Sequence, residues 1–194
     1  IESVKKKEAD IVISAGNTGA LLVIAKLNLK MIENIDKPAL SALWPNKKGM
    51  SVVLDLGANI ECNDKNLIDF AFMGSSLFKS LYPDELAKVA LLNIGTEEIK
   101  GNETIKETYQ KLNQIENSDY EFKGYIEGNQ LMNGDVNVIV ADGFTGNVAL
   151  KTAEGTANFI TDELKKAMSE NIIGKLSSLL NIKNLKKFKK RLDP

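Results

Sequence analysis

Short apolar runs alternate along this chain with longer stretches of helical periodicity. Nearly continuous apolar runs predict strands, because strands covered on both faces of a sheet have this composition. These runs occupy residues 10–14, 39–43, 51–56, 89–94, 120–126 and 136–141. Apolar residues recur at helical spacing in residues 20–32, 67–81, 104–115 and 147–168. Strands alternating with helices predict an α/β fold with a mainly parallel sheet.

Three of the predicted strands lead into turns built from Gly and Asn. These turns are Ser14–Gly19, Asp55–Asn59 and Asp142–Asn147. The first and third open directly onto a predicted helix. Gly lets a backbone approach a ligand closely, and a helix N-terminus attracts anions. Since such turns share the carboxyl edge of a parallel sheet, the sequence predicts a phosphate-binding site assembled from several loops.

Each turn also has a purely structural interpretation. Ser14–Gly19 lacks the spacing of dinucleotide-binding and P-loop motifs, and it is equally typical of a tight turn capped by Asn or Thr. Asp55 and Asp142 could each bind a metal or orient a base, or each could cap its own turn, which is the commoner role. Lys151 follows Asn147 by one helical turn, so it either faces the same ligand or is solvated.

A polar loop with Gly at both ends follows the predicted strand 89–94. It contains Lys100 and leads to Asn102. Two interpretations of this loop agree equally well with the sequence: a mobile lid over the site and a plain surface loop.

The composition narrows the possible chemistry. Hydrophobic residues make up 43% and charged residues 26% of the 194 residues, which indicates a soluble globular protein. There is no histidine, so a Ser-His-Asp triad, a Cys-His pair and a His-ligated metal are excluded within this chain. The lone cysteine, Cys62, has no disulfide partner, which favours a reducing compartment, and we interpret it as a small buried or half-buried residue.

The charge is unevenly distributed. Residues 165–191 carry nine basic side chains against one acidic, a net +8, whereas the remainder carries a net −9. Apolar residues recur among these lysines at helical spacing, so we predict a core at 1–162 and a basic amphipathic helical projection at 163–194. Its predicted contacts with a membrane or an acidic partner are Ile173, Leu176, Leu180, Lys183 and Lys187. Packing on a partner subunit is the other interpretation.

Taken in order, these motifs resemble the bacterial phosphate acyltransferases of phospholipid synthesis. The matching segments are SAGNTGAL at 14–21, LDLGAN at 54–59 with Cys62, LLNIGTEEIKGNE at 91–103, IEGN at 126–129 and DGFTGNVALKTAEG at 142–155. The resemblance implies a three-layer α/β/α sandwich like those of phosphotransacetylase and the isocitrate and isopropylmalate dehydrogenases. Family chains continue on both sides of the region matched here, so this chain resembles their central portion.

The resemblance also implies an activity and its partners. Such enzymes transfer a fatty acyl group from acyl carrier protein to inorganic phosphate and need no metal or cofactor. They are cytoplasmic homodimers, peripherally associated with the membrane, where a glycerol-3-phosphate acyltransferase uses the acyl phosphate. No nucleic-acid partner is expected. The basic projection would contact the membrane or acyl carrier protein.

Phosphate is itself a nucleophile, which agrees with the absence of histidine. By this resemblance the catalytic residues are Asn17, Lys151 and Asp142, with Asp142 orienting Lys151 or a loop N–H group. The predicted phosphate and acyl contacts are Gly16, Thr18, Gly19, Asp55, Asn59, Lys100, Asn102, Gly143, Gly146 and Asn147. The alternatives are a short-chain phosphotransacylase that uses coenzyme A and a non-catalytic module that binds an acyl carrier or a membrane.

Overall fold

A five-stranded sheet forms the centre of the fold. The computed structural model describes residues 1–115 and 119–192. The strands are β1 (Ser41–Asn46), β2 (Gly49–Leu54), β3 (Ala87–Asn93), β4 (Tyr120–Glu127) and β5 (Val138–Val140), in the spatial order β1-β2-β5-β3-β4. β2, β5, β3 and β4 are parallel neighbours, whereas β1 is antiparallel to β2. The carboxyl ends of the four parallel strands therefore meet at one edge.

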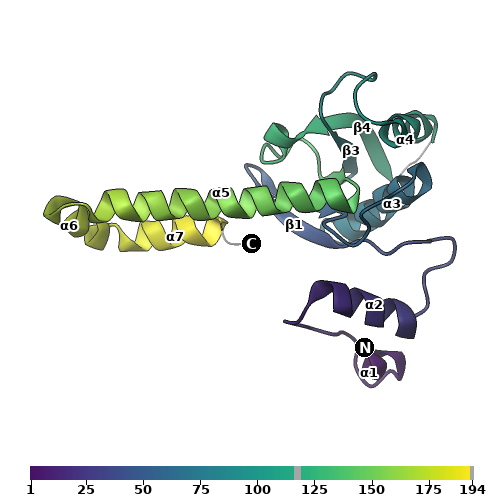
Figure 1. Ribbon diagram of the computed structural model, residues 1–194, viewed down its shortest axis with the longest axis horizontal. Coiled ribbons are helices and arrows are strands. Elements are labelled where there is room, and N and C mark those ends of the chain that lie inside the picture. The colour runs from purple at the N-terminus through teal and green to yellow at the C-terminus, as the bar shows by residue number, and fades with distance from the viewer. Residues whose placement is uncertain (116–118, 193–194) are drawn as a thin grey trace.

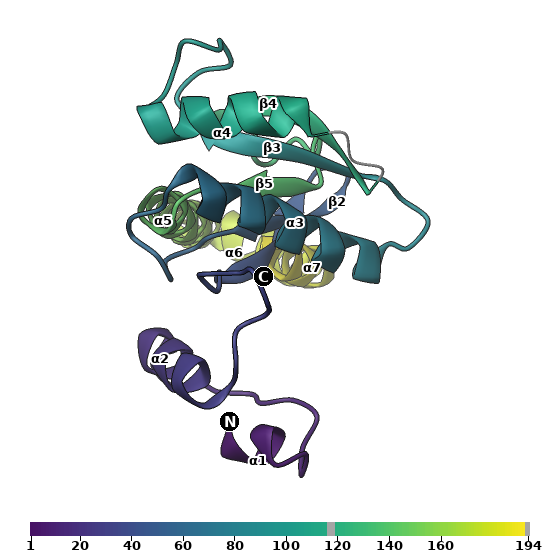
Figure 2. The ribbon, with the colours of Figure 1, turned by 90° about the vertical axis from the view of Figure 1, so that its right-hand side faces the viewer.

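Helices cover both faces of this sheet, which confirms the predicted α/β fold (Figure 2). On one face, α3 (Asp64–Leu81) and α4 (Glu103–Gln114) enclose a core that includes Phe70 and Phe78. On the other face, α5 (Gly143–Ser169) packs over Val53 and Ile139. Alternate residues of the central strands enter the two cores, as expected for strands buried on both sides.

The first two strands form a hairpin that the sequence analysis did not recognise. Asn46 pairs with Gly49, so only two residues connect β1 and β2. Gly49 has φ 146°, a conformation that side chains rarely adopt, and this permits the tight connection. Pro45 is tolerated within β1 because β1 is an edge strand.

The prediction of a buried strand at residues 10–14 is wrong. Within the described part of the chain this segment has no strand assignment, and the Ile13 side chain is 91% exposed. Its neighbours α1 (Glu2–Lys5) and α2 (Thr18–Asn28) contain no buried residue, and both views show them apart from the sheet (Figures 1 and 2). Strand hydrogen bonds would have brought the following turn to the sheet edge, and here they are not formed.

A helical projection extends from the sheet (Figure 1). At 1.5 Å per residue, the 27 residues of α5 span about 40 Å, and the helix runs unbroken across the predicted boundary at 162/163. α6 (Ile172–Leu180) turns the chain, and α7 (Ile182–Leu192) runs back in the direction of the sheet. Gly174 permits this turn, because a β-carbon there would lie 2.7 Å from the Met168 carbonyl oxygen. Residues 193–194 of the predicted projection lie outside the described residues.

Candidate functional site

A cavity of about 330 Å³ lies beyond the carboxyl edge of the parallel strands. Half of its lining comes from three loops, the one after β2, the one that leads into α4 and the one that leads into α5, and the other half comes from α3 and the first turns of α4 and α5. The lining residues are Ile60, Glu61, Cys62, Leu67, Asn102, Thr104, Ile105, Asp142, Phe144 and Thr145. The structure thus brings the second and third predicted turns and the end of the polar loop to one place.

Asp55 organises the turn after β2. Its side chain is fully buried, and its carboxylate accepts hydrogen bonds from the backbone N–H groups of Leu40, Gly57, Ala58 and Asn59 at 2.7–3.1 Å. The Asn59 side-chain amide donates to the same carboxylate at 2.7 Å. This dense set of bonds corresponds to the capping interpretation of Asp55, and its contact with substrate stays a prediction.

The N-terminus of α5 is locked against this turn through two glycines. A β-carbon at Gly146 would lie 1.9 Å from the Asp55 carbonyl oxygen, and one at Gly143 would lie 2.5 Å from the Asn59 carbonyl oxygen. The Gly143 N–H donates to that same Asn59 oxygen at 2.8 Å. Only glycine permits both close approaches, so these residues fix the relative position of two walls of the site.

Two helices begin at the cavity, each with a side-chain cap. Asn102 accepts from the Ile105 N–H at 2.9 Å at the start of α4. Asp142 accepts from the Thr145 N–H at 2.8 Å and from its hydroxyl at 2.7 Å at the start of α5. Helix N-termini carry partial positive charge, so two of them at one cavity favour an anionic ligand.

The two predicted asparagines on the turn and on α5 also lie close to this region. Asn59 donates from its amide to the Pro38 carbonyl oxygen at 2.7 Å, which ties the turn to the segment before β1. The Asn147 side chain lies over the turn, because a β-carbon at Gly57 would meet it at 3.5 Å. Both residues support the wall of the cavity.

The predicted lysines lie farther from the cavity than expected. Lys151 is on α5, eight residues or about 12 Å beyond Gly143, and its ammonium group pairs with Glu154 at 2.8 Å. Its side chain is 65% exposed, so this structure shows the solvated alternative, and a catalytic role stays a prediction. Lys100 is exposed, and its side chain lies beside Gly95 within the polar loop.

One basic residue near the cavity was missed by sequence reasoning. The Lys37 ammonium group donates to the carbonyl oxygen of the lining residue Glu61 at 2.7 Å. The sequence predicts only a break between elements at Asp36-Lys37-Pro38. No periodicity or motif distinguishes this lysine from the other surface lysines. Lys37 brings a positive charge to a cavity whose lining includes two acidic side chains, Glu61 and Asp142.

Cys62 lines the same cavity and is half-buried, as predicted. Burial raises the pKa of its thiol above the ordinary value, and the negative charges of Asp55 and Asp142 act in the same direction. A hydrogen bond from the Gly143 N–H and the charge of Lys37 oppose this shift. The thiol is therefore protonated at neutral pH, which disfavours a role as nucleophile.

The structure does not bring the first predicted turn to the cavity. Gly16, Asn17, Thr18 and Gly19 are all exposed, and they belong to the segment that lies apart from the sheet (Figure 1). Asn17 caps α2 by accepting from the Ala20 N–H at 3.0 Å. The expectation that three turns share one edge is therefore correct only for the second and third turns, and the phosphate-binding role of the first stays a prediction.

The predicted contact residues of the projection are exposed. Ile173 is 81%, Leu176 59% and Leu180 79% exposed, and together they form an apolar surface on α6 at the end of the projection. Lys183 and Lys187 are exposed on α7. No described helix is both long and apolar enough to span a bilayer. Among the described residues, no group of three or more metal-ligating side chains that could hold an ion was found.

The chain is similar in sequence to known proteins. A family model described as "Fatty acid synthesis protein" matches residues 1–194. The chain is 87% identical over its whole length to a phosphate acyltransferase of Pelagibacter ubique and 45% identical to one of Maricaulis maris. It spans 58% and 55% of the lengths of these relatives.

The fold also resembles that of EutD phosphotransacetylase from Staphylococcus aureus. The TM-score is 0.57 at 17% identity, and the match covers 80% of this chain and 54% of that structure. At this identity the likeness concerns the fold alone, and it agrees with the predicted resemblance to phosphotransacetylase.

Proposed function

This chain belongs to the fatty acid synthesis protein family, and we propose that it carries part of an enzyme that transfers a fatty acyl group to inorganic phosphate. The acyl donor in this proposal is acyl carrier protein, and the product is an acyl phosphate used in phospholipid synthesis. The observation that carries the proposal is the cavity at which α4 and α5 both begin. Such a site can hold an anionic nucleophile without histidine or metal.

The chemical step needs little from the protein besides position and charge. A phosphate oxygen attacks the carbonyl carbon of the thioester, and the thiolate of the carrier leaves. Positioning the two reactants can supply several kcal/mol, and each donor to the developing oxyanion supplies about 3–4 kcal/mol. The N-terminal turns of α4 and α5 would provide these donors, and Lys37 would add positive charge.

A charge-changing substitution at a helix cap tests this proposal. Asp and Asn cap helices equally well, so Asn102→Asp should keep α4 intact while adding a negative charge to the cavity. We expect the KM for phosphate to rise at least tenfold in the intact protein. The matched control is Asn171→Asp, since Asn171 caps α6 by accepting from the Gly174 N–H at 2.7 Å, remote from the cavity. Equal kinetics for both variants would refute an anion site at this cavity.

The same assay separates the possible acyl donors. Acyl phosphate formation should require acyl carrier protein as the acyl donor, and acyl-coenzyme A should be used poorly. The reverse preference would indicate a short-chain phosphotransacylase, and no turnover with either would indicate a non-catalytic module. Lys151→Ala should also lower phosphate-dependent turnover if Lys151 reaches the substrate.

We also propose that the exposed apolar surface of α6 contacts a membrane. Ile173, Leu176 and Leu180 would enter the interface, while Lys183 and Lys187 would attract anionic lipid. Leu176→Glu combined with Leu180→Glu should abolish cosedimentation with vesicles that contain phosphatidylglycerol. Leu86→Glu, at another exposed leucine, should not, and unchanged binding of the double variant would contradict this contact.

The proposal also includes a cytoplasmic location, a homodimer and delivery of the product to a glycerol-3-phosphate acyltransferase. The lysines of the projection could instead bind acyl carrier protein, which is acidic. Titration of the intact protein with the carrier in the absence of vesicles would distinguish this contact from the membrane contact.

A further inference from the structure

The polar loop between β3 and α4 (residues 94–102) ends at the candidate site. Asn102, its last residue, lines the cavity and caps α4. The body of α4 is held by the burial of Ile105 and Leu112, but most of the loop before it is exposed, with Ile99 at 79%. The few contacts that the loop makes therefore decide how well the first turn of α4 is placed.

Asn93 meets this loop from the sheet. It is the last residue of β3, its side chain is buried, and it is not among the residues that line the cavity. Its amide nitrogen donates to the Lys100 carbonyl oxygen at 3.1 Å. Its Oδ1 lies against Gly101, because a β-carbon there would be 2.6 Å from that oxygen. Asn93 thus contacts the two residues that directly precede Asn102.

This contact is better protected from water than the other side-chain bond of the loop. The Tyr109 hydroxyl donates to the Glu98 carboxylate at 3.0 Å, but this bond is exposed, so water competes with it. The Asn93 amide is buried, and a buried hydrogen bond is electrostatically stronger than one in water. Gly101 has φ 94°, which side chains rarely adopt, so the chain can turn at this point into the Asn102 cap.

We propose that Asn93 is a positioning residue for the phosphate nucleophile. It holds Lys100 and Gly101, and through them it sets the place of the Asn102 cap and of the first N–H groups of α4. It acts through the start of this helix and does not touch the substrate itself. The inference rests on the proposed function, because it takes the anion bound at this helix start to be phosphate.

Asn93→Leu tests the inference, since leucine has the same branching and a similar size but cannot donate a hydrogen bond. In the intact protein we expect the KM for phosphate to rise at least tenfold and the KM for the acyl donor to stay within twofold. A general loosening of the protein would alter both constants.

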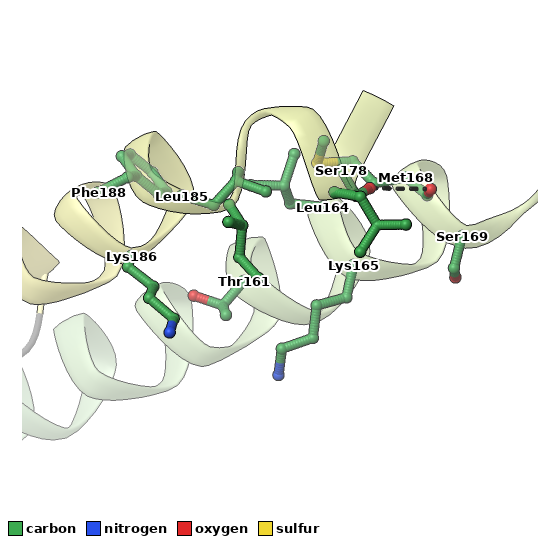
Figure 3. A pocket seen from close by; sticks show the side chains of 11 residues that line it. Thr161, Leu164, Lys165, Met168, Ser169, Ser178, Leu185, Lys186 and Phe188 are labelled. Carbon is green, nitrogen blue, oxygen red and sulfur yellow. Dashed lines mark hydrogen bonds between the residues drawn. The ribbon is translucent and has the colours of Figure 1, made fainter. Parts of the chain in front are cut away.

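Two control variants remove comparable hydrogen bonds elsewhere. Asn137, at the opposite edge of the sheet, accepts from the Lys88 N–H at 3.0 Å, and Asn137→Leu removes this bond. The Ser178 hydroxyl in the projection donates to the Met168 carbonyl oxygen at 3.3 Å, and Ser178→Ala removes that bond (Figure 3). Both variants should leave the two KM values unchanged.

Hydrogen–deuterium exchange measured by mass spectrometry gives a readout that needs no turnover. The Ile105 N–H is protected by its bond to the Asn102 side chain. Exchange in peptides that cover residues 101–106 should therefore accelerate at least threefold in Asn93→Leu and not in the controls. Inorganic phosphate should slow this exchange in the wild type, and Asn93→Leu should need at least tenfold more phosphate for the same protection.

Gly101→Ala disturbs the same contact from the side of the loop and leaves β3 unchanged. Its β-carbon would collide with the Asn93 oxygen, so the phosphate KM should rise here too. The matched control is Gly124→Ala. Gly124 also has a positive φ, 80°, but its β-carbon would come no closer than 3.4 Å to the Tyr109 ring, so this variant should leave the phosphate KM unchanged.

Several results would overturn the inference: an unchanged phosphate KM in both Asn93→Leu and Gly101→Ala, an equal rise in the KM for the acyl donor, or equal effects in the controls. Exchange at residues 101–106 that responds neither to Asn93→Leu nor to phosphate would also overturn it. If the wild type forms no acyl phosphate, the proposed function fails, and the phosphate dependence of exchange still decides whether Asn93 positions an anion site.

Discussion

Gly146→Ala should separate the two walls of the candidate site. The added β-carbon would lie 1.9 Å from the Asp55 carbonyl oxygen, and contacts below 3.0 Å are essentially never seen, so the backbones must move apart by about 1.1 Å. Overpacking of this kind costs about 3 kcal/mol at the upper end of its usual range, and the better helix propensity of alanine returns at most about 1 kcal/mol. We therefore expect a net loss of about 2 kcal/mol in the free energy of unfolding.

The same substitution elsewhere in α5 provides the control. A β-carbon at Gly155 would meet no atom within 4 Å, so Gly155→Ala should stabilise the protein by about 0.5–1 kcal/mol. Urea denaturation followed by circular dichroism measures both variants, and the expected difference between them is roughly 3 kcal/mol.

Activity gives an independent measure of the same displacement. A shift of about 1 Å in positioning groups can lower turnover about 10²-fold, so Gly146→Ala should lose acyl phosphate formation while Gly155→Ala keeps it. Equal unfolding midpoints for the two variants, together with full turnover of Gly146→Ala, would refute the view that Gly146 fixes the site.

Three further predictions concern titratable residues. Asp55→Asn should lower the free energy of unfolding by about 2–4 kcal/mol, because an amide nitrogen would face buried N–H donors; urea midpoints within error of wild type would contradict this. A hydrogen bond from Lys111 lowers the pKa of Asp64, so their pair stabilises the fold above about pH 4 and its contribution disappears as pH falls through the lowered pKa. The melting temperatures of Lys111→Met and wild type should therefore differ slightly at pH 7 and converge near pH 2, whereas a constant gap would argue against the pair. Because the pKa of Cys62 is raised, its alkylation by iodoacetamide at pH 7.5 should be slower than that of free cysteine and should accelerate above pH 9, as mass spectrometry can follow.

The sequence predicted most elements of the fold because their signals are local. The central strands are nearly continuous apolar runs, and each of α2, α3, α4 and α5 begins at an Asn or Asp cap that can be read from the sequence. The strand expected at 10–14 has an equally apolar pattern, but a strand also needs a neighbour, which a local pattern does not specify. The hairpin between β1 and β2 was missed because Lys47 and Lys48 are not typical turn residues.

The sequence predicted only those parts of the candidate site that directly follow neighbouring strands of the sheet. The turn at Asp55–Asn59 and the start of α5 follow neighbouring parallel strands, so their meeting was expected from topology. The roles of Asp55 and Lys37 depend on contacts between distant segments. Asp55 binds the Leu40 N–H and Lys37 binds the Glu61 carbonyl oxygen, and neither contact has a sequence signature.

The unbroken course of α5 gives this molecule a mechanical property. The helix has 27 residues, begins in the wall of the candidate site and leads to the exposed apolar surface of α6. It behaves as a lever that Gly143 and Gly146 hold at its N-terminal end. A tilt of about 5° over its length of about 40 Å moves the tip by about 3.5 Å. Conversely, a force on the tip becomes a torque on the loops that line the cavity. Anchoring the distal end to a surface would thus restrict the motions available to the reacting groups, without any ligand passing between the two places.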